Sequence, residues 1–244
     1  MKTLSVSLGF VTAIGLLGCS DGGPGKSVSL SFAGRQASVT AAPAVYSSPA
    51  SSAADVLVIT KAEVVLREIE LKAVETADCD LVPEPAGCEE FEVGPIRLNI
   101  PTTAGATAQV TVDLPPGTYK EIDFEIHKLT SDQVDATFAA ANPDLVGKSI
   151  VVTGTFNGNA FTYVSDLDVE QEIALVPNLV VTETTTSNNL TVQVNLGSWF
   201  LNSSGALIDP ATANKGGQNE SVVKENIKRS MKAFEDKDHD GDEG

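Results

Sequence analysis

The sequence predicts a mainly β protein, an antiparallel β-sandwich with one amphipathic α-helix near its C-terminus. Apolar and polar residues alternate in many short segments between residues 27 and 208, as they do in strands that bury one face. Turn-forming residues separate these segments at short, regular intervals, which is typical of a sandwich. A helical period of apolar residues is seen only in residues 219–235.

The first strong strand signals lie in residues 27–32 ("SVSLSF") and 55–73 ("DVLVITKAEVVLREIELKA"). Val, Ile and Thr dominate the start of the second segment, and β-branched side chains prefer the pleated surface of a sheet. Its apolar phase shifts by one residue between Leu66 and Ile69. We therefore predict either a β-bulge in one long strand or a short break between two strands.

Residues 107–114 and 118–127 alternate again, with a Pro-Pro-Gly turn between them, and this pattern predicts a meander. In the second segment, Ile122, Phe124 and Ile126 point inward in the predicted strand. The outward positions are Glu121, Asp123, Glu125 and His127. We interpret His127 as a solvated surface histidine on this acidic face.

Residues 130–148 contain few strand signals, and we expect a short helix or an irregular loop there. A break between two subdomains of the sandwich (27–208) is possible at this point. The next segment predicts a hairpin around Asn157 and Gly158, because these residues tolerate positive φ. Trp199 and Phe200 are expected to fill the core.

The predicted C-terminal helix spans residues 219–235. Val223, Ile227, Met231 and Phe234 recur at helical spacing, whereas most basic residues lie elsewhere around the helix. Such an apolar stripe is expected to dock on the sandwich, with binding to a membrane surface as the alternative.

The N-terminal residues, "MKTLSVSLGFVTAIGLLGC", have the form of a secretory signal. A basic residue precedes an apolar run that is too short to remain as a membrane-spanning helix. The ending Leu-Leu-Gly-Cys resembles the bacterial lipobox, which implies removal of residues 1–18 and lipidation of Cys19. Residues 19–26 would then form a lipidated tether, and Ser20 favours the outer membrane by family analogy. The alternative is an ordinary signal peptide that ends near a cysteine.

Cys79 and Cys88 remain as an even pair, which predicts a disulfide in an exported protein. Such a short loop would stabilise the fold by roughly 2.5 kcal/mol in the chain-entropy description. The alternative is a redox or metal pair. That alternative has little support, because the spacing is not C-x-x-C and no histidine lies nearby.

The chain has 33 acidic and 16 basic residues. Such a polyanion gains nothing from neutralising phosphates, so nucleic acid is not expected as a partner, whereas cations or basic surfaces are. The two histidines are not part of an H-E-x-x-H or zinc pattern. No catalysis is therefore expected. Carboxylates that meet only in space leave a hydrolase as an alternative.

The acidic tail (residues 236–244, "DKDHDGDEG") begins like a calcium loop. Side-chain oxygens would come from Asp236, Asp238 and Asp240, and a backbone oxygen from Asp242. The twelfth position of the pattern, which normally holds a bidentate acid, has no residue in this sequence. A calcium site and a solvated acidic tail are both kept as interpretations, and no other cofactor is expected.

The segments "VLVITKAEVVLREIEL", "GPIRLNI" and "LPPGTYKEIDFEI" together resemble uncharacterised bacterial lipoproteins that are grouped as domains of unknown function. The resemblance covers roughly residues 55–129, and the later "WFLNSSGALIDP" is similar to another of their segments. It implies a transthyretin-like or immunoglobulin-like sandwich without known catalysis. We expect an outer-membrane lipoprotein that serves as a binding or structural module and has an envelope or surface protein as partner. The alternative is a subunit or accessory of a surface fibre whose strand edge a partner completes.

Overall fold

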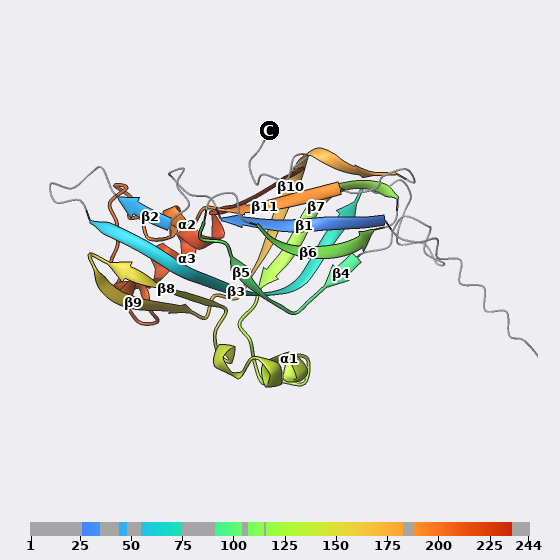
Figure 1. Ribbon diagram of the computed structural model, residues 1–244. Coiled ribbons are helices and arrows are strands. Elements are labelled where there is room, and N and C mark those ends of the chain that lie inside the picture. Colours follow the sequence, from blue (N-terminus) through green and yellow to red (C-terminus); the bar gives the residue numbers. More distant parts are fainter. Residues whose placement is uncertain are drawn as a thin grey trace, which may run out of the picture.

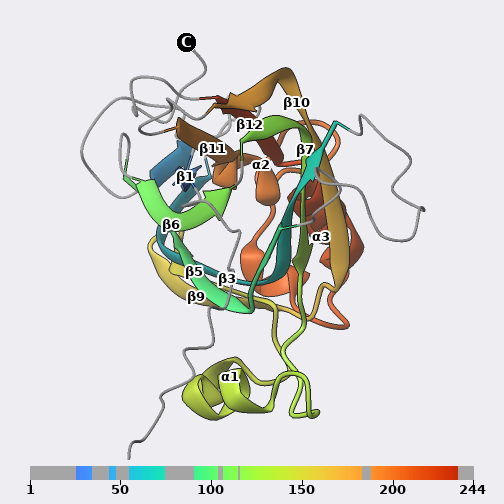
Figure 2. The ribbon, with the colours of Figure 1, turned by 90° about the vertical axis from the view of Figure 1, so that its right-hand side faces the viewer.

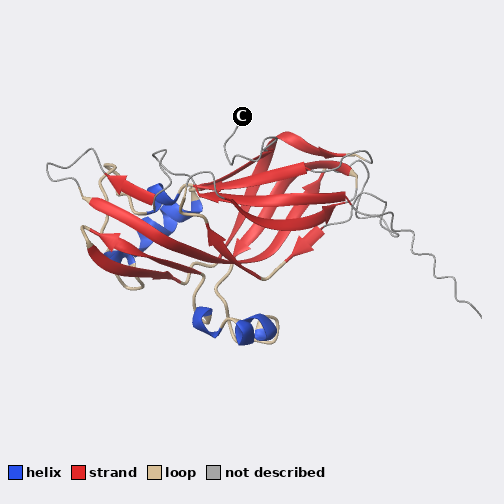
Figure 3. Ribbon diagram, viewed as in Figure 1, coloured by secondary structure: helices blue, strands red, loops and turns tan. Residues whose placement is uncertain are grey.

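The structure is a computed structural model that describes residues 26–34, 44–47, 55–74, 91–103, 107–114, 116–182 and 188–235. Strands dominate it and helices are few, as Figure 3 shows. Within these ranges, no helix has the length and apolar character needed to cross a membrane.

The strands form two sheets. The strands are β1 (Lys26–Gly34), β2 (Ala44–Ser47), β3 (Val56–Ala73), β4 (Phe91–Val93), β5 (Ile96–Ile100), β6 (Thr107–Leu114), β7 (Gly117–Ile126), β8 (Ile150–Phe156), β9 (Asn159–Ser165), β10 (Val169–Val181), β11 (Asn188–Val194) and β12 (Met231–Glu235). The helices are α1 (Ala136–Ala141), α2 (Leu196–Trp199) and α3 (Glu220–Lys228), with 3-10 turns η1 (Pro143–Leu145) and η2 (Pro210–Ala213).

One sheet has the order β12-β11-β1-β6, and the other has the order β10-β7-β3-β8-β9. Strands β2, β4 and β5 pair with β3 in the second sheet. The sheets pack through their apolar faces, where the rings of Phe32 in β1 and Phe124 in β7 meet edge to face with centroids 6.4 Å apart. The predicted β-sandwich is confirmed. Strands β1 and β11 form a parallel pair within it.

The long strand β3 connects the two ends of the molecule (Figure 1). Its first half pairs with β8 and its second half with β7. The pairing with β7 shifts register between Arg67 and Glu70, and Glu68 between them has a positive φ of 54°. The predicted bulge in a single strand is therefore confirmed.

The predicted meander over residues 107–127 is wrong. Strand β6 pairs with β1 in one sheet, whereas β7 pairs with β3 and β10 in the other. The Pro-Pro-Gly segment therefore joins two sheets instead of two neighbours in one sheet. Alternation in the sequence indicates which face of each strand is buried, but it does not identify the neighbouring strand.

The C-terminal helix is shorter than predicted. Helix α3 ends at Lys228, and its buried Val223 and Ile227 pack on the core, as expected. Met231 and Phe234 lie in β12, which pairs with β11. The helical spacing of these two residues does not decide their conformation, because strand pairing with β11 contributes more than local helix propensity.

Other local predictions agree with the structure. Trp199 and Phe200 are fully buried, and the Trp199 indole nitrogen donates to Ser230 Oγ at 2.8 Å. Asn157 and Gly158 have positive φ angles of 51° and 79° in the turn between β8 and β9. A short helix, α1, lies in residues 130–148, where a helix or loop was expected.

Candidate functional site

An acidic face covers the outer side of β3, β7 and the start of β10. It comprises Glu68, Glu70, Asp123, Glu125, Asp168, Glu170 and Glu172. The strand register places Glu170 opposite Glu125 and Glu172 opposite Asp123. Like charges directly opposite each other on neighbouring strands are unfavourable. This face therefore concentrates negative charge at a cost to stability.

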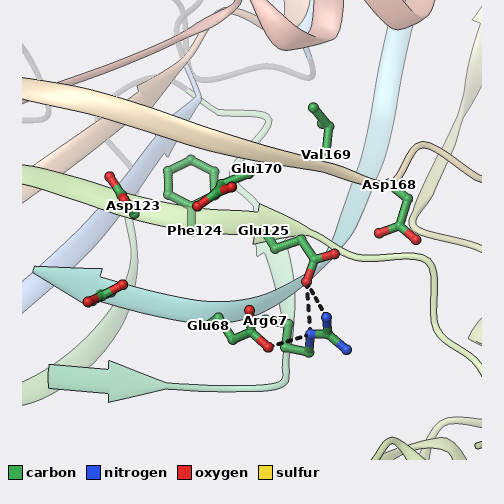
Figure 4. Close-up of a pocket in the computed structure, with 9 residues that line it drawn as sticks. Arg67, Glu68, Asp123, Phe124, Glu125, Asp168, Val169 and Glu170 are labelled. Carbon is green, nitrogen blue, oxygen red and sulfur yellow. Dashed lines mark hydrogen bonds and ion pairs between the residues drawn. The ribbon is translucent and has the colours of Figure 1, made fainter. Parts of the chain in front are cut away.

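A groove of about 350 Å³ runs along this face. Phe124, Val169 and Arg67 line it together with most of the acidic face. Figure 4 shows Asp168 and Glu125 near one end, with Glu125 pointing toward the Arg67 guanidinium. The Asp168 side chain is 49% exposed, so this end of the groove is open to solvent.

His127 is not the solvated histidine that its position in the alternating pattern predicts. It is only 4% exposed, and Asp123 on the same face is 2% exposed. The α1 loop (residues 128–149) follows His127 directly and lies beyond the end of β7 (Figure 2). Its Leu129, Ala139 and Leu145 form a small apolar cluster with Val65, which fixes the loop against the sheet.

Arg97 of β5 also holds the α1 loop in place. Its guanidinium contacts the buried Glu63 at 2.6 Å and Asp144 of η1 at 2.9 Å. Lys61 provides a second cation for Glu63 at 2.8 Å. These ion pairs join the loop to β3 and β5, so the residues around His127 are held from two sides.

The His127 ring is oriented by one end of this loop. The backbone nitrogen of His127 donates to Val65 O at 3.0 Å. The ring Nε2 of His127 lies 2.7 Å from Asp135 Oδ2. Thr130 donates to the same oxygen from its backbone nitrogen (2.9 Å) and its hydroxyl (2.8 Å). Burial opposes ionisation of Asp135, but the hydrogen bonds from His127 and Thr130 outweigh it and lower the pKa of this carboxyl.

Because ionised Asp135 can only accept, Nε2 carries a hydrogen and donates to it, and Nδ1 is the ring nitrogen left for other partners. Nδ1 lies 3.7 Å from Glu125 Oε1 and 3.6 Å from Asp168 Oδ1. It has no hydrogen-bond partner among the residues that the structure describes. One ligand atom from each of Glu125, His127 and Asp168 lies within 4.8 Å of the others. We call these three residues the histidine–carboxylate cluster.

The two carboxylate oxygens of Glu125 have different neighbours. Its Oε2 accepts from Arg67 Nε at 2.8 Å and Nη2 at 2.7 Å, while its Oε1 faces His127. Burial, with the nearby Asp168 carboxyl as the next contribution, raises the pKa of Glu125. Arg67 opposes this rise and is itself shared with Glu68 at 3.0 Å.

A second acidic group, formed by Asp123, Glu170 and Glu172, differs in one respect. Lys72 forms an ion pair with Asp123, and this hydrogen bond raises the pKa of Lys72 above its ordinary value. In the second group, the buried Asp123 therefore already has the Lys72 ammonium as its partner. This group has no histidine, and its ligands are all oxygen atoms.

The predicted site residues lie outside the described residues. They are Cys19 for lipidation, Cys79 and Cys88 for a disulfide, and Asp236, Asp238, Asp240 and Asp242 for calcium. Those interpretations remain predictions. The sequence contained one signal for the histidine–carboxylate cluster, the alternating acids around "DFEIH", but it gave no sign that Asp168 and Asp135 would meet His127.

No protein-family model, curated protein or solved structure matches this chain.

Proposed function

We propose that the protein is an exported, lipid-anchored and non-catalytic binding module whose acidic face binds cationic ligands. The observation that supports this function best is the row of like charges across β7 and β10. The register places Glu170 against Glu125 and Glu172 against Asp123. Acids that oppose each other in a sheet weaken the fold, so a cationic ligand gives a physical reason for their arrangement.

The proposed location rests on the N-terminal sequence. A short apolar run followed by Leu-Leu-Gly-Cys supports export, lipidation at Cys19 and attachment to the outer membrane. Several acyl chains on one cysteine would hold the protein stably at the membrane. The partners in this proposal are the membrane, through the anchor, and a cationic ligand or basic envelope protein at the acidic face.

Binding at the acidic face can be tested with a fluorescent hexalysine peptide and the full chain purified in detergent. We expect binding that weakens as salt increases, and a loss of affinity of at least fivefold in Glu170→Lys. The matched control is Glu225→Lys in α3, which changes the net charge equally at a half-exposed position outside the acidic face. Equal losses in both variants would show that only net charge matters.

The anchor can be tested separately by feeding an alkyne fatty acid to a bacterial host that makes the full chain. We expect label on the wild-type protein and its recovery with membranes. Cys19→Ser should lose both properties, whereas Cys79→Ser should retain them. Label that persists in Cys19→Ser would exclude the proposed anchor.

A carboxylate-based hydrolase is the second candidate, and the raised pKa of Glu125 favours it. A carboxyl with a raised pKa holds its proton to a higher pH, as a general acid must, and Asp168 would be the second carboxyl of the pair. A screen of glycoside substrates tests this role, since a hydrolase would lose turnover in Glu125→Gln. A binding module would show no turnover in either form.

A further inference from the structure

We propose that the histidine–carboxylate cluster is a site for a first-row divalent transition metal ion such as Zn²⁺. The ligands are His127 Nδ1, Glu125 Oε1 and Asp168 Oδ1. The inference rests on the proposed function only in that it assigns one specific ligand to the acidic face. It adds an inner-sphere site with defined donors to a surface that otherwise attracts any cation.

The spacing of the donors fits a tetrahedral ion. Two ligands that each lie about 2.1 Å from such an ion are roughly 3.4 Å apart. Nδ1 already lies 3.6 Å from Asp168 and 3.7 Å from Glu125. Only small side-chain movements would bring all three donors to coordinating distance, and a fourth position would face the groove.

The buried imidazole distinguishes this cluster from an ordinary group of surface acids. His127 is 4% exposed, and its Nδ1 points toward two carboxylates instead of a hydrogen-bond donor. Buried polar atoms without a partner are rare in folded proteins, and Nδ1 has none among the described residues. A metal ion bound between Nδ1 and the two carboxylates would give all three a partner.

The surroundings of the donors are those of metal ligands. The other ring nitrogen of His127 donates to Asp135, which is the usual carboxylate–histidine arrangement behind a metal. Arg67 fixes the second oxygen of Glu125, so Oε1 remains directed at the ring. The backbone nitrogen of Lys128 lies 3.4 Å from Asp168 Oδ1, a weak contact that leaves this oxygen a second lone pair.

The donor set favours a transition metal over calcium or magnesium. One imidazole nitrogen with two carboxylate oxygens suits zinc and its neighbours, whereas calcium requires six to eight oxygen ligands. The oxygen-only group at Asp123 already contains the Lys72 ammonium. The histidine–carboxylate cluster is therefore the site at which we expect a tightly held ion.

The test is a calorimetric Zn²⁺ titration of the full chain, purified in detergent and freed of metal with a chelator. We expect one equivalent of zinc to bind, without competition from millimolar Ca²⁺. His127→Ala and Asp168→Asn should each weaken binding by at least 100-fold. Asp135→Asn, which changes a positioning residue, should weaken it by about 10- to 100-fold.

The matched control is His239→Ala, because His239 is the second histidine of the chain and lies in the acidic tail. Its affinity for zinc should equal that of the wild type. Co²⁺ provides a second readout: its visible absorption should indicate a four-coordinate ion in the wild type, and Asp135→Asn should retain this spectrum at lower affinity. Circular dichroism checks the fold of His127→Ala. The half-exposed Asp168→Asn decides the question if that variant unfolds.

Two outcomes would overturn the inference. One is the absence of stoichiometric zinc binding, and the other is unchanged affinity in both His127→Ala and Asp168→Asn. Neither outcome changes the hexalysine result, so a wrong metal site is distinguishable from a wrong proposed function. If hexalysine fails to bind while zinc does, the broader binding role falls and the metal site stands.

Discussion

Asp166 and Asp168 lie two residues apart between β9 and β10, yet their electrostatic environments are opposite. Asp166 accepts from Lys215 and Lys224, each at 2.8 Å, and these two ammonium groups lower its pKa strongly. Asp168 instead faces the Glu125 carboxyl and Nδ1 of His127. Two lysines therefore pair with one carboxylate, whereas no lysine or arginine side chain among the described residues pairs with the other.

The ion pairs of Asp166 indicate that this carboxylate stabilises the fold, whereas we propose that Asp168 binds a ligand. Lys224 belongs to α3 and Lys215 follows η2, so Asp166 ties the helical segments to the end of β9. Asp168 joins no elements through an ion pair with a lysine or arginine among the described residues, and it adds repulsion beside Glu125. A cation bound at Asp168 would offset this repulsion, which is the role proposed for its ligand.

The largest expected effect in this comparison is the loss of stability in Asp166→Asn. Removing this carboxylate leaves Lys215 without its partner and the partly buried Lys224 with Glu220 alone, and should lower the free energy of unfolding by about 1–3 kcal/mol. Asp168→Asn should leave it unchanged or raise it slightly, because a repulsion is removed. Urea unfolding at neutral pH measures both variants. Equal destabilisation would show that Asp168 is also a structural charge.

The next effect concerns acid. The pKa of Asp166 is lowered in the folded protein, so its contribution is present above the ordinary aspartate pKa of about 3.9 and is lost as the pH falls below that value. Asp166→Asn should therefore lose less stability than the wild type between pH 5 and pH 2. Parallel curves for the two proteins in urea unfolding would contradict this assignment.

The pKa shift of Glu125 is opposite in direction to that of Asp166, and we expect it to change the stability by less. Burial raises the pKa of Glu125, so its favourable contribution is present below the ordinary glutamate pKa of about 4.3 and is lost as the pH rises through the raised value. The stability of the wild type relative to Glu125→Gln should therefore fall as the pH rises above about 4.3. Added Zn²⁺ should reverse this fall, since a bound ion favours the carboxylate. A rise with pH in metal-free protein would contradict the assignment.

The sequence predicted the sandwich because burial of one strand face leaves a period of two. Ile122, Phe124 and Ile126 are all buried, as their alternation predicts. The same pattern could not show that β6 and β7 enter different sheets, because partner choice depends on contacts far apart in the chain. It also placed Phe234 in a helix, whereas pairing with β11 decides its conformation.

The histidine–carboxylate cluster could not be predicted for a related reason. The period of two correctly put Glu125 and His127 on the same side of β7, but it implied that this side is solvated. Burial of His127 comes from the α1 loop, which has no periodic signal. Asp168 lies between β9 and β10, about 40 residues after His127 in the sequence. The cluster therefore depends on a tertiary contact that local sequence patterns do not indicate.

The smallest expected effect separates the two lysines of Asp166. The Lys224 side chain is 24% exposed and also pairs with Glu220 at 2.7 Å, whereas the Lys215 side chain is 76% exposed. Solvent screens an exposed ion pair and leaves it little net energy, so Lys215→Ala should change the free energy of unfolding less than Lys224→Ala. Urea unfolding in low and high salt measures both. A larger loss of unfolding free energy in Lys215→Ala would show that the exposed Lys215 ammonium is the main partner of Asp166. The difference between Asp166 and Asp168 would then arise from a surface ion pair and not from the packing of α3.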